Sequence, residues 1–398
     1  MKAAIVIERI EPWRGGAEIS TLQLARRLAA NGVDVTLLTA SRGASTPDLR
    51  IVTLPVGAVP SPLRLRAFAR RAAAAAQRER FDVVHAIPPV PGCDVYQPRG
   101  GLVRETLARN VALRPDAGRR FLKRVASALN VKRRAVLDFE SRVCRPGGPV
   151  ILAVSQYVAE QLRAQYGLAP PQVRVVFNGV EIEAVPPETR LAWREEVRSR
   201  YGVDDGTMLA LCVAHNFRLK GVGPLIEAVA RAGRPLGGRI HLIVVGRDNP
   251  VRYIDLGRRL GIGERVTFAG PTQRIGAFYA AADVCAHPTW YDPCSRVVLE
   301  AASRGLPCIT TRYNGASEAL RDGVHGFVLD RPDDVDALAD RLVRMADADL
   351  RQRMSIEAAR LAPALSMARH AREVLEVYRG LALRRTEAPA TATRGSRR

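Results

Sequence analysis

The feature that most constrains the fold is a repeated alternation of short apolar segments with longer segments of helical periodicity. In the first part of the chain the apolar segments are AAIVI, VDVTLLT, RIVTL, FDVVHA and ILAVS. Strands that are apolar on both faces are typical of parallel sheets covered by helices on both sides. The order of strand, helix and strand therefore predicts an α/β fold.

One helical segment shows the pattern clearly. In AEISTLQLARRLAANG, the side chains of Ile19, Leu22 and Leu28 share one face of a helix. The Asn31-Gly32 pair that follows is a typical helix end.

The alternation restarts in the second half with VRVVF, TMLALCVA, RIHLIVVG, RVTFAG, ADVCAH and LPCITT. The join lies near residues 173–187, where FNGVEIEAVPPE changes rhythm and its two prolines suit a linker. We predict two doubly wound, Rossmann-like domains, residues 1–175 and 176–365. A last helix over 366–385 could cross back to the first domain, and the polar tail 386–398 is expected to be disordered. Because ligands of such sheets bind at the carboxyl ends of strands, two facing domains imply a cleft between them.

The charge of the chain favours anionic partners. The formal net charge is +21, and residues 99–145 alone carry 13 Lys or Arg against 4 Asp or Glu. Anionic lipid, nucleic acid and phosphorylated substrates are all compatible with this excess, as is a solvated helical surface.

The six cysteines lie far apart and form no C-x-x-C pair, so a reduced compartment is the simplest interpretation and a zinc ribbon is unsupported. No apolar run approaches the roughly 18 residues of a membrane span.

Two turns have the composition of anion-binding sites. Gly15-Gly16 follows a strand and opens a helix, where backbone N–H groups can approach an anion closely, although such a loop can also merely turn. In AHNFRLKGVGPLIEA, Arg218 and Lys220 lie between a strand end and a helix start. Two cations there suit a diphosphate, and plain surface charge is the alternative.

The stretch DPCSRVVLEAASRGLP holds two acids, Asp292 and Glu300. We expect a helix from about Ser295, with free backbone N–H groups at Ser295, Arg296 and Val297 for a phosphate. Asp292 could accept sugar hydroxyls or act only as an acid before a helix. Glu300 could accept hydrogen bonds from both hydroxyls of a ribose. Alternatively, Glu300 could simply lie on an exposed helix face.

Two Asp-x-Asp triplets and one histidine are further polar candidates. The triplets Asp334-Val335-Asp336 and Asp347-Ala348-Asp349 lie on polar helices rather than after a buried strand, so we interpret them as solvated and expect no metal site. His85 ends FDVVHA and is predicted to face the cleft, where it could position acceptor or sugar. A hydrogen-bonded histidine at a strand end is the alternative.

These motifs resemble those of a known family. The spacing Asp292-x7-Glu300 followed by Ala-Ser-Arg-Gly-Leu-Pro is similar to the E-x7-E segment of the retaining glycosyltransferases of family 4, which have the GT-B fold. The Gly15-Gly16 and Arg218/Lys220 turns occur in the family's order, over roughly residues 1–360. FRLKGVGPLIEA, VVGRDNP and VPGCDVY further resemble the members that glucosylate the lipopolysaccharide core.

The resemblance implies a nucleotide-sugar donor, UDP-glucose by the narrower likeness, and transfer with retention. Arg218 and Lys220 would hold the diphosphate, Glu300 the ribose and Asp292 the transferred sugar. We take Arg218, Lys220, Asp292 and His85 as the catalytic candidates.

The remaining donor contacts implied by the family are backbone groups. Arg296, Val297 and Val298 would offer N–H groups to the phosphates, and Gly15 and Gly16 would abut the distal phosphate and the acceptor. This chain has Asp292 where the family usually has Glu, and Cys294-Ser295 replaces a frequent Phe-Gly. No metal or other cofactor is expected, because fixed cations and amide dipoles can stabilise the leaving diphosphate.

The basic segment over residues 100–135 suits a membrane surface. Phe121, Leu122, Val125 and Leu129 can form one helix face, with Arg119, Arg120, Lys123 and Arg124 around it. We therefore expect a cytoplasmic enzyme, peripheral on the inner face of the plasma membrane, with a glycan or glycolipid acceptor. A sugar-nucleotide epimerase on the same scaffold and a nucleic-acid-binding protein are the alternatives, although no nucleic-acid motif is present.

Overall fold

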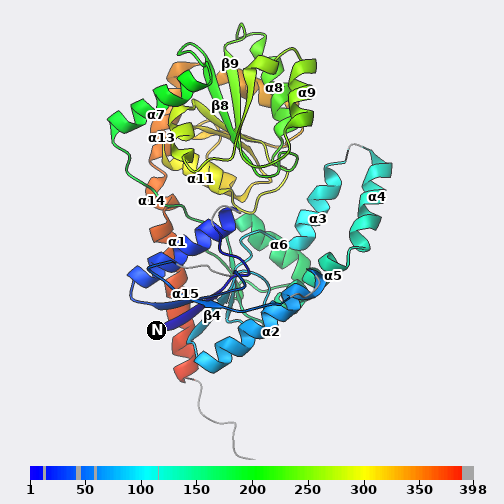
Figure 1. Cartoon of the computed structure of the whole chain (residues 1–398), viewed down its shortest axis with the longest axis vertical. Coiled ribbons are helices and arrows are strands. Elements are labelled where there is room, and N and C mark those ends of the chain that lie inside the picture. The colour runs from blue at the N-terminus through cyan, green and yellow to red at the C-terminus, as the bar shows by residue number, and fades with distance from the viewer. Residues whose placement is uncertain (12–14, 42–45, 58–60, 115, 388–398) are drawn as a thin grey trace, which may run out of the picture.

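The computed structural model describes residues 1–387 except 12–14, 42–45, 58–60 and 115. Two α/β units lie one above the other, and the C-terminal end of the chain returns from the second unit to run along the first (Figure 1). The predicted tail, residues 386–398, falls outside the described residues from 388 onward.

The first sheet is parallel and, among the described residues, has seven strands in the order β3-β2-β1-β4-β5-β6-β7. Its strands are β1 (Lys2–Val6), β2 (Asp34–Thr39), β3 (Arg50–Thr53), β4 (Val83–Ala86), β5 (Val95–Tyr96), β6 (Val150–Ala153) and β7 (Val173–Val175). The segment VRVVF, with which the second set was expected to start, instead supplies β7 at the edge of this first sheet.

The second sheet is also parallel, with six described strands in the order β10-β9-β8-β11-β12-β13. They are β8 (Met208–Val213), β9 (Ile240–Val245), β10 (Val266–Gly270), β11 (Val284–His287), β12 (Cys308–Thr311) and β13 (Gly326–Leu329). The predicted fold class, two Rossmann-like domains of GT-B type, is confirmed. Sequence patterning missed β5 and β13, because β5 pairs over only two residues and β13 opens with glycine.

Helices cover both sheets. The first unit contains α1 (Gly16–Ala30), α2 (Ser61–Glu79), α3 (Val103–Ala112), α4 (Ala117–Ala128), α5 (Val131–Val143) and α6 (Gln156–Tyr166). The second contains α7 (Pro187–Arg200), α8 (Val222–Gly233), α9 (Val251–Arg259), α10 (Ile275–Ala281), α11 (Arg296–Ser303), α12 (Val335–Arg344) and α13 (Ala348–Ala359), followed by α14 (Ala362–Leu365) and α15 (Met367–Glu387). Short 3₁₀ turns lie at Gly263–Arg265 and Gly315–Ala319.

The C-terminal helix α15 packs on the first sheet beside α1 (Figure 1). Its Val374 and Tyr378 side chains are fully buried against Leu24 and Leu28 of α1 and Ile5 of β1. Burial of side chains of this size is the main stabilising term for such a contact. The last helix therefore completes the core of the unit that contains the N-terminus.

Helices α3 and α4 together form a projection, the α3–α4 excursion, that extends from the first unit and rises beside the second (Figure 1). The start of α3 is held by Glu140 of α5, whose carboxylate accepts the Val103 N–H at 3.0 Å. None of the described residues of α4 is buried.

The two units are joined by hydrogen bonds at the start of α6. The Glu318 carboxylate of the second unit accepts the backbone N–H groups of Gln156 and Tyr157 at 2.8 and 2.6 Å. Ser155 Oγ donates to Pro293 O at 2.6 Å. An acid at a helix start also interacts favourably with the helix dipole, so this contact helps to fix the two units against each other.

We predict that Tyr378→Ala lowers the free energy of unfolding by about 3–5 kcal/mol, because a fully buried aromatic ring leaves a cavity when it is truncated. Chemical denaturation followed by circular dichroism measures the change. Leu191→Ala, at a side chain 59% exposed on α7, is the control and should alter stability by less than about 0.5 kcal/mol. Equal losses in the two variants would contradict the proposed packing of α15.

Candidate active site

The turn after β8 lies against the loop that follows β11. Lys220 Nζ donates to Asp292 Oδ2 at 2.5 Å and to the Tyr291 carbonyl at 3.3 Å. Gly221 adopts a φ of +72°, and a Cβ there would lie 2.1 Å from the Pro288 carbonyl oxygen. Only glycine accommodates both conditions, so this residue lets the Lys220 turn approach the Asp292 loop.

The Asp292 carboxylate is held in its charged form. Burial by itself would raise the pKa of Asp292, but the Lys220 ammonium and the neighbouring His287 lower it well below its usual range. His287 Nε2 lies 3.8 Å from Asp292 Oδ2, and burial lowers the pKa of this imidazole. Asp292 Oδ1 also accepts the Cys294 N–H at 3.2 Å. Because α11 begins only at Arg296, Asp292 does not act as a simple cap of that helix.

Glu300 is preorganised by two partners. Its Oε1 accepts from Arg296 Nη2 at 2.9 Å and its Oε2 from the Tyr279 hydroxyl at 3.1 Å. The Glu300 side chain is 19% exposed, whereas Val298 and Leu299 beside it are fully buried. The alternative of an exposed helix face is therefore wrong. Each carboxylate oxygen keeps a lone pair that could accept a hydroxyl.

Arg296 brings the starts of α1 and α11 together. Its Nη1 donates to Gln23 Oε1 of α1 at 3.0 Å, and a Cβ on Gly16 would lie only 3.0 Å from Arg296 Cδ. The lack of a side chain at Gly16 therefore lets the guanidinium lie against the first residue of α1. The first turn of α11 therefore lies next to the start of α1 through the Arg296 side chain.

The start of α11 differs in one respect from the expectation. The Ser295 N–H donates to Asn314 Oδ1 at 3.0 Å, so the prediction that it is free for a ligand is wrong. Asn314 is a fully buried side chain that sequence reasoning did not select. The following N–H groups, of Arg296, Val297 and Val298, form the first turn of α11, which no described side chain caps.

Arg218 reaches across to the first unit. Its Nη2 donates to the carbonyl of Leu113, just after α3, at 3.0 Å. Burial and the nearby Arg114 guanidinium lower the pKa of Arg218. Arg218, the cation predicted for a diphosphate, thus lies between the units and also touches the α3–α4 excursion at the connection between its two helices.

His85 does not face the cleft as predicted. The side chain is fully buried, and its Nδ1 lies 2.7 Å from the Tyr378 hydroxyl of α15. Burial lowers the pKa of His85 to about 3, so the ring is neutral at physiological pH. The sheet register explains the error, because His85 pairs with Ile5 and shares the face that α15 covers.

The two Asp-x-Asp triplets serve as helix caps. Asp334 accepts from the Ala337 N–H at the start of α12, and Asp347 accepts from the N–H groups of Asp349 and Leu350 at the start of α13. In the part of the chain that the structure describes, no group of three or more His, Cys, Asp or Glu could hold a metal ion.

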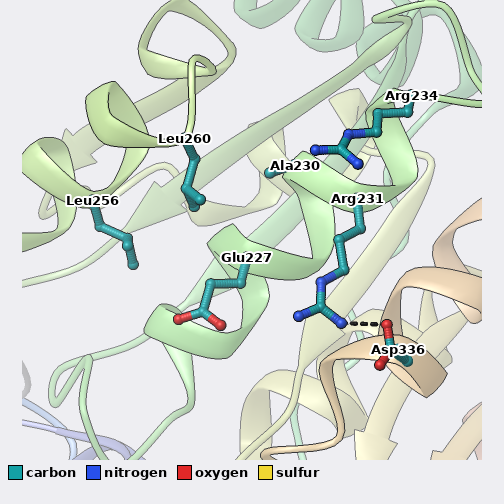
Figure 2. Close-up of a pocket in the computed structure, with 7 residues that line it drawn as sticks. All are labelled: Glu227, Ala230, Arg231, Arg234, Leu256, Leu260 and Asp336. Carbon is teal, nitrogen blue, oxygen red and sulfur yellow. Dashed lines mark hydrogen bonds and ion pairs between the residues drawn. The ribbon is translucent and has the colours of Figure 1, made fainter.

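A groove on the outer side of the second unit is separate from these residues. It is lined by Glu227, Ala230, Arg231 and Arg234 of α8, Leu256 and Leu260 at α9, and Asp336 of α12, with an Arg231–Asp336 ion pair at one end (Figure 2). Substitutions in this groove therefore serve as controls that leave the residues of the site intact.

Two family models match the chain in the order of its two units. "Glycosyltransferase Family 4" matches residues 14–184, and "Glycosyl transferases group 1" matches residues 194–361. The chain belongs to the family 4 glycosyltransferases. It is therefore an enzyme that transfers glycosyl groups, as the Asp292 and Glu300 spacing indicated.

Curated relatives of this glycosyltransferase extend over most of its length. The D-inositol 3-phosphate glycosyltransferase of Nocardiopsis dassonvillei is 27% identical, covering 92% of this chain and 89% of the relative. The lipopolysaccharide glucosyltransferase WaaG of Escherichia coli is 26% identical, covering 80% and 82%.

Solved structures share the fold. A crystal structure of WaaG superposes with a TM-score of 0.79 at 23% identity, covering 95% of this chain and all of that one. Anabaena HepE in complex with UDP-glucose gives a TM-score of 0.72 at 18% identity, covering 96% and 100%.

Sequence reasoning missed several residues of the site. Tyr279, which orients Glu300, lies on a short apolar helix and gave no signal of its own. His287 was seen only as a strand end. Gln23 lies within α1 and became relevant only when Arg296 reached it across the two units.

We predict that Asp292→Asn flattens the acid limb of the stability profile of this glycosyltransferase. The folded pKa of Asp292 lies below the unfolded value of about 3.9, so its contribution is present above about pH 4 and is lost as pH falls toward the folded pKa. The variant should also lose about 3–5 kcal/mol at neutral pH, since Lys220 is left unpaired.

Unfolding free energies measured between acid and neutral pH test this prediction. Asp336→Asn, at an exposed ion pair, is the control and should leave the pH profile nearly unchanged. An acid limb as steep in Asp292→Asn as in the wild type would count against a buried ion pair.

Proposed function

We propose that this glycosyltransferase moves a hexose, glucose, from a UDP-sugar to a lipid-linked glycan acceptor at an anionic membrane surface, with retention of configuration. The proposed acceptor rests on one observation, the exposed apolar face of α4 beside the interdomain region. The proposed donor rests on the groups around α11. HepE, solved with UDP-glucose, and WaaG, named a lipopolysaccharide glucosyltransferase, support the choice of donor and acceptor.

The donor would bind across the starts of α11 and α8. Glu300, oriented by Arg296 and Tyr279, would accept the ribose hydroxyls. The N–H groups of Arg296, Val297 and Val298 would receive the phosphates at the positive end of the helix. A diphosphate would also compete with the Leu113 carbonyl for Arg218.

The chemical step would be driven by fixed positive charge. As the glycosidic bond breaks, the leaving diphosphate gains negative charge, which Lys220 and Arg218 stabilise without reorganising. Asp292 would accept a hydroxyl of the transferred sugar and keep Lys220 in place. We propose that this arrangement needs no metal ion. We propose that retention arises by displacement on one face of the sugar, in which the acceptor oxygen bonds to the anomeric carbon, the diphosphate leaves and one of its oxygens takes the acceptor proton.

The surface of α4 supports attachment to a membrane. Phe121, Leu122 and Leu129 are 63%, 67% and 68% exposed, and Val125 lies on the same face. Exposed apolar patches with cations beside them are typical of helices that lie at an anionic lipid interface. Within the described residues, no helix is both long and apolar enough to cross a bilayer. The proposed attachment is therefore peripheral, at the cytoplasmic leaflet.

A second candidate acceptor is a small sugar phosphate in solution. The relatives named D-inositol 3-phosphate glycosyltransferase favour it, since one of them matches 92% of this chain. The epimerase alternative has no support among the curated relatives described above, which are both named as transferases. Incubation with UDP-glucose alone separates the cases, because efficient epimerisation would contradict transfer.

We expect Glu300→Ala to weaken UDP binding by about 10- to 100-fold, the usual effect of losing a hydrogen bond to a charged group. A thermal-shift titration with UDP measures the affinity, because a ligand of the folded state raises the melting temperature by mass action. Glu227→Ala, in the outer groove, is the matched control and should bind UDP as the wild type does. Unchanged UDP affinity in Glu300→Ala would remove its donor role.

Replacing Leu122 and Leu129 with serine should lower binding to vesicles containing anionic lipid by about 10-fold or more, since two exposed apolar side chains no longer enter the interface. Co-sedimentation with vesicles measures this. The control replaces Leu191 and Ile356, two other exposed apolar side chains on α7 and α13, with serine. Equal vesicle binding by both double variants would exclude α4 as the attachment surface.

A further inference from the structure

A buried arginine of the first unit lacks a charge partner. Arg99 is only 8% exposed and lies three residues after the end of β5. Its Nη1 donates to Ser20 Oγ of α1 and its Nη2 to His370 Nε2 at 3.1 Å, while its Nε has no partner among the described residues. Arg99 forms no ion pair with any carboxylate of the described residues. A buried cation usually has a paired anion, so this arrangement is incomplete as it stands.

The neighbouring histidine, His370, is neutral and does not balance the positive charge of Arg99. His370 Nδ1 lies 2.8 Å from the Phe177 carbonyl, so Nδ1 carries the proton and Nε2 accepts from Arg99. Burial and the Arg99 guanidinium keep the pKa of His370 well below its usual value, and the ring is neutral. The two bonded nitrogens of Arg99 therefore have neutral partners only.

Further unpaired polar atoms lie near Arg99. His85 pairs with Val95 of β5 in the parallel register, and Gln97 and Arg99 lie in the segment that follows β5. His85 Nε2 and both polar atoms of the Gln97 side chain are buried without partners. In either tautomer of His85, the unpaired Arg99 Nε and Gln97 Nε2 atoms supply three N–H groups. Hydrogen-bond donors thus outnumber acceptors among the unpaired atoms.

Arg296 of the second unit adds positive charge near Arg99. The Arg296 guanidinium is close enough to Arg99 that, after burial, it is the main cause that lowers the pKa of Arg99, to about 9. Arg296 lies against Gly16, the exposed first residue of α1, and Ser20 is one turn further along that helix. The start of α1 is itself favourable for an anion.

We propose that Arg99 and Ser20, next to Arg296 at the start of α1, form a subsite for a phosphoryl group of the acceptor. This inference rests on the proposed transferase function, because it assigns the donor diphosphate to the second unit and the anion at Arg99 to the other substrate. A phosphoryl oxygen would take the unpaired Arg99 Nε–H and the free donors beside it. The acceptor would then be a phosphorylated sugar, whether soluble or lipid-linked.

Isothermal titration of the full chain with inorganic phosphate, in the presence of saturating UDP, tests the subsite. Phosphate should bind the UDP-loaded protein, and Arg99→Gln should weaken that binding by about 10- to 100-fold, because a charge-assisted hydrogen bond is lost. UDP affinity should stay within about twofold in the same variant. Arg231→Gln, an exposed arginine of the outer groove, is the matched control and should bind phosphate as the wild type does.

Phosphate binding that UDP abolishes would place the anion in the donor site and overturn the proposal. Absence of phosphate binding, or equal binding by wild type and Arg99→Gln, would also overturn it. If Arg99→Gln does not fold by circular dichroism, Arg99→Lys keeps the charge but loses the guanidinium fork. Weaker phosphate binding in Arg99→Lys then supports the subsite, and unchanged binding excludes it.

Two sources of the phosphoryl group can be separated with the same protein. Inositol 1-phosphate and unphosphorylated inositol probe a sugar-linked group, and inorganic phosphate probes the free ion. Tighter binding of the sugar phosphate than of either other probe supports an acceptor subsite. Binding of inorganic phosphate alone would indicate an ion site without a role in acceptor recognition. Failure of UDP itself to bind would instead contradict the proposed function, which keeps the two failures distinct.

Discussion

The arrangement of the site depends on one guanidinium, that of Arg296. From the first turn of α11 it bonds Glu300 four residues on, reaches Gln23 of α1 and lies against Gly16. A side chain on Gly16 would require the arginine side chain to shift. Because hydrogen bonds to a charged group are stronger than neutral ones, this contact holds the donor-binding acid and the first unit in one geometry.

The charged side chains of the site lie between the two units. Lys220 has a carboxylate partner in Asp292, and Arg296 has one in Glu300. Arg218 and Arg99 instead bond to neutral groups: a backbone carbonyl, a hydroxyl and an imidazole. A transferase that receives anionic substrates can use such cations, since charge fixed in advance need not reorganise when a ligand arrives. The net charge of +21 is consistent with this use and with attraction of anionic surfaces.

The α3–α4 excursion connects the proposed membrane surface with the donor side. Its apolar residues are exposed on α4, while the end of α3 is contacted by Arg218 and Arg109 stacks on the Tyr313 ring at 4.1 Å. Tyr313 in turn accepts the Asp292 N–H through its carbonyl. The helix proposed to lie on lipid is thus only a few contacts away from the residues proposed to hold the sugar.

Local patterns in the sequence determined the α/β class, the two Rossmann-like units and the loops that carry Lys220, Asp292 and Glu300, because apolar periodicity and turn chemistry act over a few residues. The same patterns placed His85 in the cleft wrongly, since only the pairing of β4 with β1 and the return of α15 decide which face it occupies. They also overlooked Arg99, which becomes unusual only when burial removes water from it. Tertiary structure decided those points because the partners lie up to 293 residues apart, and no local signal reports a contact at that separation.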